Sequence, residues 1–308
     1  MRITLRQIQV FAAIARIENV SRAAESLAMS QSAASNSLVE LERQFNCPLF
    51  DRIGKSLRLN STGRGLLPQA EEMLARAADI EGYLNGGTFG PINIGATLTI
   101  GNYLATLVIA KYLQQHPQSK AQLHVANTEK IIEQLIHHEI DLGLIEGEVN
   151  HPDLFIEPWL DDALVVFCAP SHPFSNNSDI KDLSELAQQD WIVREHGSGT
   201  RALFDHVIGQ AIPNLKIRLA LEHTEAIKRA VESGLGIGCL SRLSLREAFR
   251  RGSLIEIPTP QFNLNRQFYF ARHRQRYLSP AAEYFLTLCR EASGTARGTD
   301  TIQLPFIG

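Results

Sequence analysis

Hydrophobic residues near the start of the chain recur at helical spacing and divide into three short segments. The first segment places Leu5, Ile8, Phe11, Ala12 and Ala15 on one face, which predicts a helix. A second and a third helical segment follow, joined by a tight turn, and the third runs to about residue 45. This succession predicts a small helical domain at the head of the chain.

The turn between the second and third segments has the features of a helix-turn-helix. Ser21 and Ser30 stand at predicted helix starts, where a serine oxygen accepts a free backbone amide. Ala23 and Ala24 are small enough to let the two helices pack closely. The apolar residues that enclose the turn and continue the buried face are Leu27, Met29, Leu38 and Leu41. A helix held in this way can enter the DNA major groove, so the pattern predicts a reader of DNA.

A basic hairpin follows the third helix. Residues 48–59 read as two short strands around Gly54-Lys55-Ser56, and their basic side chains can straddle a phosphate backbone. We interpret this hairpin as a wing beside the helix-turn-helix.

A long helix is predicted from Thr62 to Asn85. Its apolar residues alternate at spacings of four and three, which is typical of a coiled-coil seam: Leu66, Ala70, Met73, Ala77, Ile80 and Leu84. The seam can pair two copies of the chain or pack on its own domain. We favour the dimer, because the segment is long and ends in the flexible run Asn85-Gly86-Gly87-Thr88.

From residue 91 the pattern changes to short apolar runs that alternate with helical segments. Strands are predicted at 92–96, 122–126, 141–146, 164–169, 191–194, 218–221, 237–240 and 267–272, and helices at 103–115, 128–138, 200–210, 225–233 and 281–291. This alternation implies an α/β fold, with a parallel sheet and right-handed crossovers, in two similar units. The tail beyond residue 292 carries little pattern, and we expect it to be mobile.

Composition adds few constraints. The 308 residues suit two or three domains, and the apolar content of 44% is ordinary for a folded protein. No apolar run approaches the roughly 18–20 residues that span a bilayer, and the N-terminus does not read as an export signal. We therefore expect a cytoplasmic protein without membrane contact. The cysteines form no CxxC pair and suit a reducing compartment: Cys47, Cys168, Cys239 and Cys289.

The charge is distributed unevenly. Through Arg64 there are nine basic and five acidic side chains, a net charge of +4, whereas the whole chain carries −3 and the remainder therefore −7. A basic head on an acidic body fits a DNA-binding module attached to a second function.

The chain resembles the LysR-type transcriptional regulators over nearly its full length. The stretches that carry the resemblance are Phe11–Ala15, Ser21–Ala24, Ser30–Ser35, Leu41-Glu42, Pro48–Arg52, Leu66–Pro68 and Val231–Gly238. The chain departs from the family pattern at Asn36-Ser37 and at Asn60–Gly63, which bears on the operator sequence.

The resemblance implies a domain order. A winged helix-turn-helix occupies residues 1–61, and a dimerising linker helix with a hinge occupies 62–90. An effector domain like a periplasmic binding protein follows at 91–293, and its two Rossmann-like lobes span about 91–163 with 267–293 and about 164–266. Residues 294–308 form the tail.

A second motif narrows the resemblance. Arg194-Glu195-His196-Gly197-Ser198-Gly199-Thr200-Arg201 is similar to the Arg-Glu-x-Gly-Ser-Gly-Thr-Arg branch, which includes regulators of carbon fixation and of sulfite or sulfur metabolism. The resemblance implies that the effector is a small metabolite, often an anion.

Candidate DNA contacts lie on the third helix and the wing. Gln31 is the best base reader, since its amide can bond adenine in two places, and Ser32, Ser35 and Asn36 come next. The serines can equally contact phosphate. The candidates for phosphate contact, or else solvated surface charges, are Arg22, Arg52, Lys55 and Arg58.

Candidate effector contacts lie at three predicted helix starts, where free amides favour anions. These residues are Thr97, Leu98 and Thr99, then Gly197, Ser198, Gly199 and Thr200, and finally His223 and Thr224. In a two-lobed sheet protein such strand ends face the ligand cleft. The alternative is plain helix capping by Thr99, Ser198 and Thr224.

Glu146 ends a predicted strand and points to the same cleft. Because a carboxylate repels a bare anion, it would take a proton from an oxyanion such as bisulfite, or pair with Arg194, Arg201 or His223. A structural salt bridge is the alternative, and His172 is a weaker candidate contact.

The sequence favours a regulator over an enzyme. We find no nucleophile elbow, dinucleotide fingerprint or metal-binding spacing, and predict no catalytic residue, metal or cofactor. The expected partners are double-stranded DNA, a small anionic effector (sulfite or a related sulfur oxyanion, otherwise a small carboxylate or phosphorylated metabolite), a homodimer or homotetramer, and RNA polymerase. A solute-binding protein or a transferase on the same two lobes is the alternative of another class.

Overall fold

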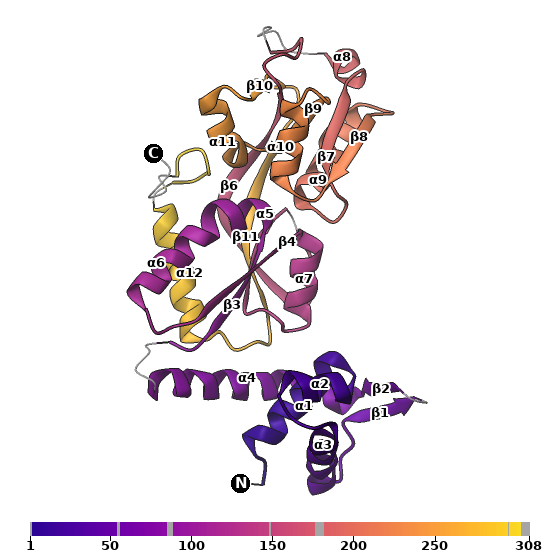
Figure 1. Cartoon of the computed structure of the whole chain (residues 1–308), viewed down its shortest axis with the longest axis vertical. Helices are drawn as coiled ribbons and strands as arrows, with labels where there is room; N and C mark the ends of the chain where they lie inside the picture. Colours follow the sequence, from indigo (N-terminus) through magenta and orange to yellow (C-terminus); the bar gives the residue numbers. More distant parts are fainter. Residues whose placement is uncertain are drawn as a thin grey trace. The chain divides into compact units, whose positions relative to one another are not determined.

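The chain divides into two units by its internal contacts. The computed structural model describes residues 2–53, 56–84, 89–147, 149–175, 182–294 and 296–302. The first unit consists of Met1–Pro91 with Gln275–Pro280, and the second of Ile92–Arg274 with Ala281–Gly308. Figure 1 labels most helices and strands of both, and we describe each unit by itself.

Three helices form the head of the first unit: α1 (Leu5–Ile17), α2 (Val20–Ser26) and α3 (Gln31–Phe45). Their core includes Phe11 and Ala24, which are almost fully buried, and the ring of Phe11 meets that of Phe50 edge-on at 5.9 Å. Ala34 on α3 is also buried. The three predicted helices are therefore confirmed.

One of the two predicted helix caps is wrong. Ser30 caps α3 as predicted, because its side chain accepts a hydrogen bond from the amide of Ala33. Asn19, not Ser21, caps α2: its backbone is extended and its side-chain oxygen accepts from the Arg22 amide at 3.1 Å. The helix thus begins one residue before Ser21, which lies inside its first turn.

The predicted wing is a hairpin of β1 (Phe50–Ile53) and β2 (Ser56–Leu59), which pair antiparallel. Glu42 on α3 anchors it, because its carboxylate accepts hydrogen bonds from the amides of Leu49 (2.7 Å) and Phe50 (3.3 Å).

The long helix α4 (Ser61–Leu84) has two differently buried halves. In the first half Ala70 is buried against the head, and Glu71 is 5% exposed and paired with Arg16 at 2.8 Å. In the second half Ile80 is 61% and Leu84 76% exposed. Only the second half of the predicted seam therefore leaves its apolar residues uncovered in the described part of the chain.

The second unit is built on one sheet with the strand order β4-β3-β5-β11-β6-β9-β7-β8, and β10 pairs with β6. The strands are β3 (Ile92–Thr97), β4 (Ala121–Ala126), β5 (Leu142–Glu146), β6 (Leu154–Cys168), β7 (Asp190–Arg194), β8 (Lys216–Leu221), β9 (Ile237–Ser241), β10 (Ile255–Ile257) and β11 (Asn265–His273).

Helices cover the sheet in two groups. The first group consists of α5 (Leu98–Ile100), a π-helical turn at Gly101–Ala105, α6 (Thr106–Gln115), α7 (Thr128–Ile136) and α12 (Pro280–Ser293). The second consists of α8 (Leu183–Ala187), α9 (Gly199–Phe204), a π-helical turn at Asp205–Gly209, α10 (Thr224–Glu232) and α11 (Arg242–Arg251). We call β3–β5 with the first group lobe I, and β7–β10 with the second group lobe II.

The sheet is mixed, which corrects the prediction of a parallel sheet. Within each lobe the pairs β3·β4, β3·β5, β7·β8 and β7·β9 are parallel, as predicted. The long strand β6 pairs antiparallel with β11 through residue 163 and with β9 from residue 164 onward. Figure 1 shows β6 and β11 running between the two groups of strands, and these crossing strands account for the antiparallel pairs.

The sequence pattern missed short or irregular elements. It did not predict the first ten residues of β6, nor α8, α11 and β10. Within the tail that the sequence predicts to be mobile, residues 296–302 include buried side chains, since Thr299 is 4% and Ile302 1% exposed. Among the described residues, no helix combines the length and apolar character needed to cross a membrane.

The caps of α2 give a test of this local structure. Asn19→Ala should destabilise the first turn of α2 by about 0.5–2 kcal/mol and speed its amide exchange roughly two- to thirtyfold, because an amide loses its acceptor. Ser21→Ala, the matched control, should leave exchange unchanged or slower, since alanine suits a helix interior. Segment-resolved hydrogen exchange measures both variants. Faster exchange in Ser21→Ala than in Asn19→Ala would instead identify Ser21 as the cap.

Candidate functional site

The start of α3 presents polar side chains above a buried apolar face. Gln31, Ser32 and Asn36 are exposed and Ser35 is half-buried, while Ala34 is fully covered. The cap Ser30 lies 3.1 Å from Ser32, hydroxyl to hydroxyl. The predicted base readers therefore lie together on one accessible helix end.

The predicted phosphate contacts differ in their surroundings. Arg22 is exposed near the start of α2. Arg58 on the wing forms an ion pair with Glu18, whose other oxygen accepts from the Leu59 amide at 3.2 Å. Lys55 and the side chain of Arg52 lie outside the described residues.

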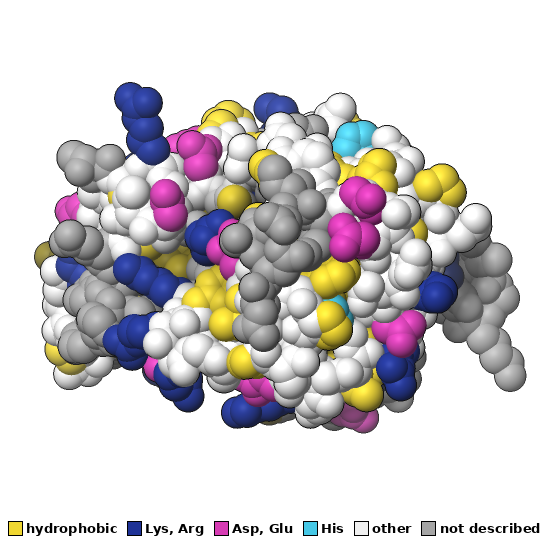
Figure 2. Space-filling view, turned by 90° about the horizontal axis from the view of Figure 1, so that it is seen from above, with side chains coloured by type: hydrophobic (Ala, Val, Ile, Leu, Met, Phe, Trp, Pro, Cys, Tyr) yellow, Lys and Arg dark blue, Asp and Glu magenta, His cyan; other side chains and the backbone are white. Residues whose placement is uncertain are grey.

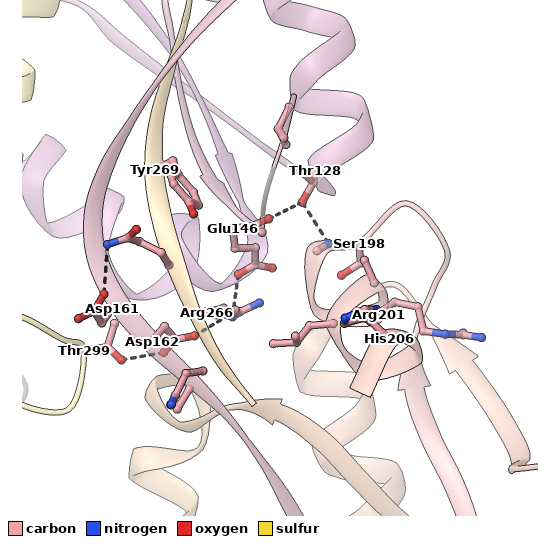
Figure 3. A pocket seen from close by; sticks show the side chains of 18 of the residues that line it. Thr128, Glu146, Asp161, Asp162, Ser198, Arg201, His206, Arg266, Tyr269 and Thr299 are labelled. Carbon is pink, nitrogen blue, oxygen red and sulfur yellow. Dashed lines mark hydrogen bonds and ion pairs between the residues drawn. The ribbon is translucent and has the colours of Figure 1, made fainter. Parts of the chain in front are cut away.

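A cleft of about 1350 Å³ opens between the lobes of the second unit. Lobe I lines it with Thr128, at the start of α7, and with Glu146, at the end of β5. Lobe II lines it with Gly197 and Ser198, just before α9, and Arg266 lines it from β11. Figure 3 shows the side chains of Thr128, Glu146, Ser198 and Arg266 converging from both lobes.

A buried charge triad of Glu146, Arg266 and Asp162 lies at the base of this cleft. Arg266 Nη2 is 3.0 Å from Glu146 Oε2, and Arg266 Nε is 2.7 Å from Asp162 Oδ2. All three side chains are at most 3% exposed. Burial by itself would lower the pKa of Arg266, but the two carboxylates outweigh it and raise that pKa, so the guanidinium stays charged.

Hydroxyl groups add hydrogen bonds around this charge triad, while Glu146 Oε2 has only its ion-pair contact with Arg266 and no hydrogen-bond partner among the described residues. Thr200 Oγ1 accepts from Arg266 Nη1 at 2.9 Å and lies 3.3 Å from Glu146 Oε1, to which it donates. Thr99 Oγ1 lies 3.5 Å from Arg266 Nη2. Ser241 donates to the second oxygen of Asp162 at 2.8 Å.

The Ser198 hydroxyl is buried in the cleft without a hydrogen-bond partner among the described residues. It is 2% exposed, and although Ser198 precedes α9 its side chain caps no amide. Thr97 and Thr224 likewise have buried hydroxyls without such a partner. Thr99 lies within the first turn of its helix and bonds Arg266. The capping alternative for Thr99, Ser198 and Thr224 is therefore wrong.

The predicted effector residues occupy different places. Those that line the cleft are Glu146, Gly197, Ser198 and Gly199. Thr99 and Thr200 are not in the cleft lining, but their hydroxyls bond Arg266, which is. Those absent from its lining are Thr97, Leu98, His223, Thr224 and His172.

The partner of Glu146 was not among the predicted ones. Arg194 pairs with its neighbour Glu195 at 2.7 Å, and Arg201 pairs with Asp205 at 2.8 Å. Arg266 takes the place that the sequence suggested for Arg194, Arg201 or His223. No pattern around Arg266 marked it, because both of its acidic partners are distant in sequence.

The lobes approach each other closely at Gly199. Its amide donates to Thr128 Oγ1 at 3.1 Å, and Thr128 donates to the Glu146 carbonyl at 3.2 Å. A Cβ at position 199 would lie 2.1 Å from that carbonyl oxygen, so only glycine permits this approach.

A second interlobe contact joins Tyr103 to lobe II. Its hydroxyl donates to Glu225 Oε1 at 2.8 Å, and Lys228 donates to the same oxygen at 2.7 Å. Burial and the acceptor Glu225 raise the pKa of Tyr103, so the phenol keeps the proton it donates.

The described residues contain no group of three or more His, Cys, Asp or Glu side chains that could hold a metal ion. Cys168 and Cys239 are buried, and burial raises the pKa of these thiols to about 11 and about 12. A thiol with a raised pKa is a poor redox sensor.

Two family models cover most of the chain. The model described as "Bacterial regulatory helix-turn-helix protein, lysR family" matches residues 5–64, and "LysR substrate binding domain" matches residues 85–294.

Individual proteins agree with these matches. The Escherichia coli (strain K12) protein described as an uncharacterized HTH-type transcriptional regulator, YeiE, is 40% identical over 95% of this chain and 99% of its own length. A RuBisCO operon transcriptional regulator of Allochromatium vinosum is 31% identical over 92% and 95%. The regulatory domain of Synechocystis CcmR, solved with 2-PG, is 28% identical with a TM-score of 0.60 and covers 67% of this chain and 98% of its own.

The charge triad yields a prediction about stability. Arg266→Met should lower the free energy of unfolding of the second unit by about 3–5 kcal/mol, because two buried carboxylates lose their counter-charge. Arg229→Met is the control: this arginine is 78% exposed and paired with Glu232, so its loss should cost under about 1 kcal/mol. Urea unfolding followed by tryptophan fluorescence measures both, since Trp159 and Trp191 lie in the second unit. Equal destabilisation of the two variants would contradict the dependence of the carboxylates on Arg266.

Proposed function

The chain belongs to the LysR family of bacterial helix-turn-helix regulators, and we propose that it is a cytoplasmic regulator whose interlobe cleft binds a small anion and thereby changes how its heads engage DNA. It is a DNA-binding transcription regulator with an effector-binding domain, and the proposal concerns its residues, ligand and mechanism. The observation that carries the proposal is the unpartnered, buried Ser198 hydroxyl in a cleft that also contains Arg266.

The DNA contacts that we propose lie on α3 and beside it. Gln31, with Ser32, Ser35 and Asn36, would meet base edges or phosphates, and Arg22 would contact the backbone. Arg52, Lys55 and Arg58 would contact phosphates from the wing. Arg58 would then exchange its ion pair with Glu18 for a phosphate oxygen, which suits an exposed and therefore weak pair.

The second half of α4 supports pairing of two copies. Ile80 and Leu84 expose apolar surface in heptad spacing, and a second copy of the same helix would cover it. We propose a homodimer through this half, alone or as part of a homotetramer.

The proposed effector is a sulfur oxyanion such as sulfite. The motif Arg194–Arg201 is similar to that of the carbon-fixation and sulfur branch, and the 2-PG bound by CcmR makes a phosphorylated or carboxylate metabolite the rival. Glu146, Gly197, Ser198 and Gly199 would contact the ligand, with Thr99 and Thr200 acting through Arg266.

The charges of the cleft define how an anion would bind. Arg266 is already matched by two carboxylates, so a bare anion meets no free positive charge in this charge triad. An oxyanion would therefore displace Glu146 from Arg266, or bring a proton and donate it in a hydrogen bond to Glu146. Ser198 would donate to the ligand in either case.

This exchange would couple ligand binding to the lobes. Glu146 belongs to lobe I, whereas Ser198 and the Tyr103 acceptor Glu225 belong to lobe II, so a ligand that rearranges these contacts changes the preferred lobe arrangement. A ligand shifts an equilibrium only by its difference in affinity for the two states. The altered effector domains would reset the spacing of the DNA-binding heads, hence the DNA bend and the contact with RNA polymerase.

A DNA-binding assay separates this proposal from a solute-binding protein or a transferase. On DNA from upstream of its own gene, log K should fall with log salt by about 0.9 per neutralised phosphate, as expected for phosphate contacts. Gln31→Ala should reduce specific binding roughly five- to 150-fold, the value of a bidentate base contact. Gln69→Ala, on α4, should leave binding unchanged. Absence of any shift on upstream fragments would contradict the proposal.

A thermal-shift screen tests the cleft. Sulfite should raise the melting temperature of the full chain more than sulfate, phosphate or 2-PG at equal concentration. Ser198→Ala should weaken the affinity roughly tenfold or more, because a hydrogen bond to a charged ligand is lost. Ser233→Ala is the control, since its exposed hydroxyl only bonds the Arg229 carbonyl. A larger shift with 2-PG would assign the effector to the rival class, and an unchanged response of Ser198→Ala would place the ligand elsewhere.

A further inference from the structure

The segment 296–302 lies along the crossing strand β6. The Asp161 amide donates to the Arg297 carbonyl at 2.9 Å, and the Thr299 amide donates back to the Asp161 carbonyl at 2.8 Å. Gly298 pairs with Asp161 in a parallel bridge. These bonds hold the segment at the place where β6 leaves its partner β11 and begins to pair with β9.

The segment also connects the two lobes. It follows α12, which is fixed to lobe I by Lys111–Glu291 at 3.1 Å and by Tyr284 donating to Gln115 at 2.9 Å. At its other end Ile302 is 1% exposed, and its carbonyl lies 3.5 Å from Arg246 Nη1 on α11 of lobe II. The chain therefore passes between the lobes a third time, after β6 and the segment leading into β11.

One hydroxyl of the segment reaches the charge triad. Thr299 Oγ1 donates to Asp162 Oδ1 at 2.7 Å, while Asp162 Oδ2 accepts from Arg266. Figure 3 shows Thr299, Asp162 and Arg266 in this succession. A hydrogen bond to a buried carboxylate orients it, so Thr299 helps to set where Asp162 holds the guanidinium.

The same segment forms part of the cleft wall. Residues 297–301 all line it. The Arg297 side chain is exposed and makes no hydrogen bond or ion pair with another residue in the described part of the chain. Figure 2, a view from above, shows Lys and Arg side chains together with Asp and Glu side chains on the face that it presents. The segment thus brings an unengaged guanidinium to the rim of the cleft.

We propose that residues 296–302 form a strap that ties the lobes together across the cleft, with Thr299 as a positioning residue for the Asp162–Arg266 pair. The matched substrate-binding domain ends at residue 294, so the strap lies beyond the region that the family model covers. The consequence of the strap for the effector rests on the proposed function. Rotation of the lobes about β6 must move or break the strap, so the affinity for the ligand depends on whether the strap is intact.

Hydrogen exchange tests the strap without ligand or DNA. Thr299→Val keeps the shape and removes the hydroxyl, so the amides of Asp161 and Thr299 should exchange about tenfold faster or more in the full chain. Thr299→Ser should restore protection. Thr287→Val is the matched control, because its exposed hydroxyl bonds the Glu283 carbonyl at 3.0 Å on α12, outside the cleft lining. A chain that ends at Gly294 should lose protection at Asp161 altogether.

The outcomes separate the strap from the proposed effector. Faster exchange in Thr299→Val, with rescue by serine and no change in Thr287→Val, supports the strap. Unchanged exchange at Asp161 in both Thr299→Val and the shortened chain overturns it, and if the shortened chain fails to fold, the point variant decides alone. Sulfite is the probe for the coupling: Thr299→Val should weaken the thermal shift that sulfite produces, and Thr287→Val should not. If sulfite stabilises neither the unaltered chain nor any variant, the effector assignment fails. The hydrogen-exchange result still tests the strap in that case.

Discussion

The burial of the three charges of Glu146, Asp162 and Arg266 is the constraint on which the second unit depends. Removing each charge from water costs several kcal/mol, and only close mutual contact with full hydrogen bonding offsets that cost. The three side chains come from three strands, β5, β6 and β11, so the offset holds only while these strand ends keep their positions. A change in the positions of these strands at the junction between the lobes would therefore weaken the charge pairing. Through the hydroxyls of Thr200, which bonds Arg266, and Thr299, which bonds Asp162, the charge triad also contacts α9 and the strap.

This constraint also explains how a cleft can act as a sensor. A preformed cleft whose buried guanidinium had no carboxylate partner would bind an anion tightly, but its lobes would gain nothing from moving. Here Arg266 is engaged before any ligand enters, so the net affinity is the difference between the hydrogen bonds that the ligand forms and those that it breaks. A ligand whose binding requires such an exchange favours one arrangement over another, and that difference is what an allosteric signal requires. The close approach at Gly199 and the Tyr103–Glu225 contact are further places where two arrangements would differ.

The sequence predicted those features that depend on neighbouring residues. The cap at Ser30, the hairpin and the long helix each follow from residues a few positions apart, and all three are present. The prediction of Ser21 as the cap failed because Asn19, two residues earlier, is also a capping residue type, and the start of α2 depends on how the chain turns at Glu18, which has a positive φ of 49°. Arg266 and Thr299 carried no local signal, since each meets Asp162 across 104 and 137 residues. Glu146, Gly197, Ser198 and Gly199 were found because strand ends and helix starts mark a cleft from sequence alone.

The two halves of α4 have different roles in the proposed dimer. The first half is locked to its own head, because the buried carboxylate of Glu71 is held by Arg16 and Ala70 packs into the head core. Pairing of two copies is then left to the second half, where Ile80 and Leu84 are uncovered. A rotation or register shift within that half would move each head as a rigid extension of its helix. The half-site spacing on DNA would therefore follow from the pairing of the second half, while under the proposed contacts the polar start of α3 would decide which bases are read.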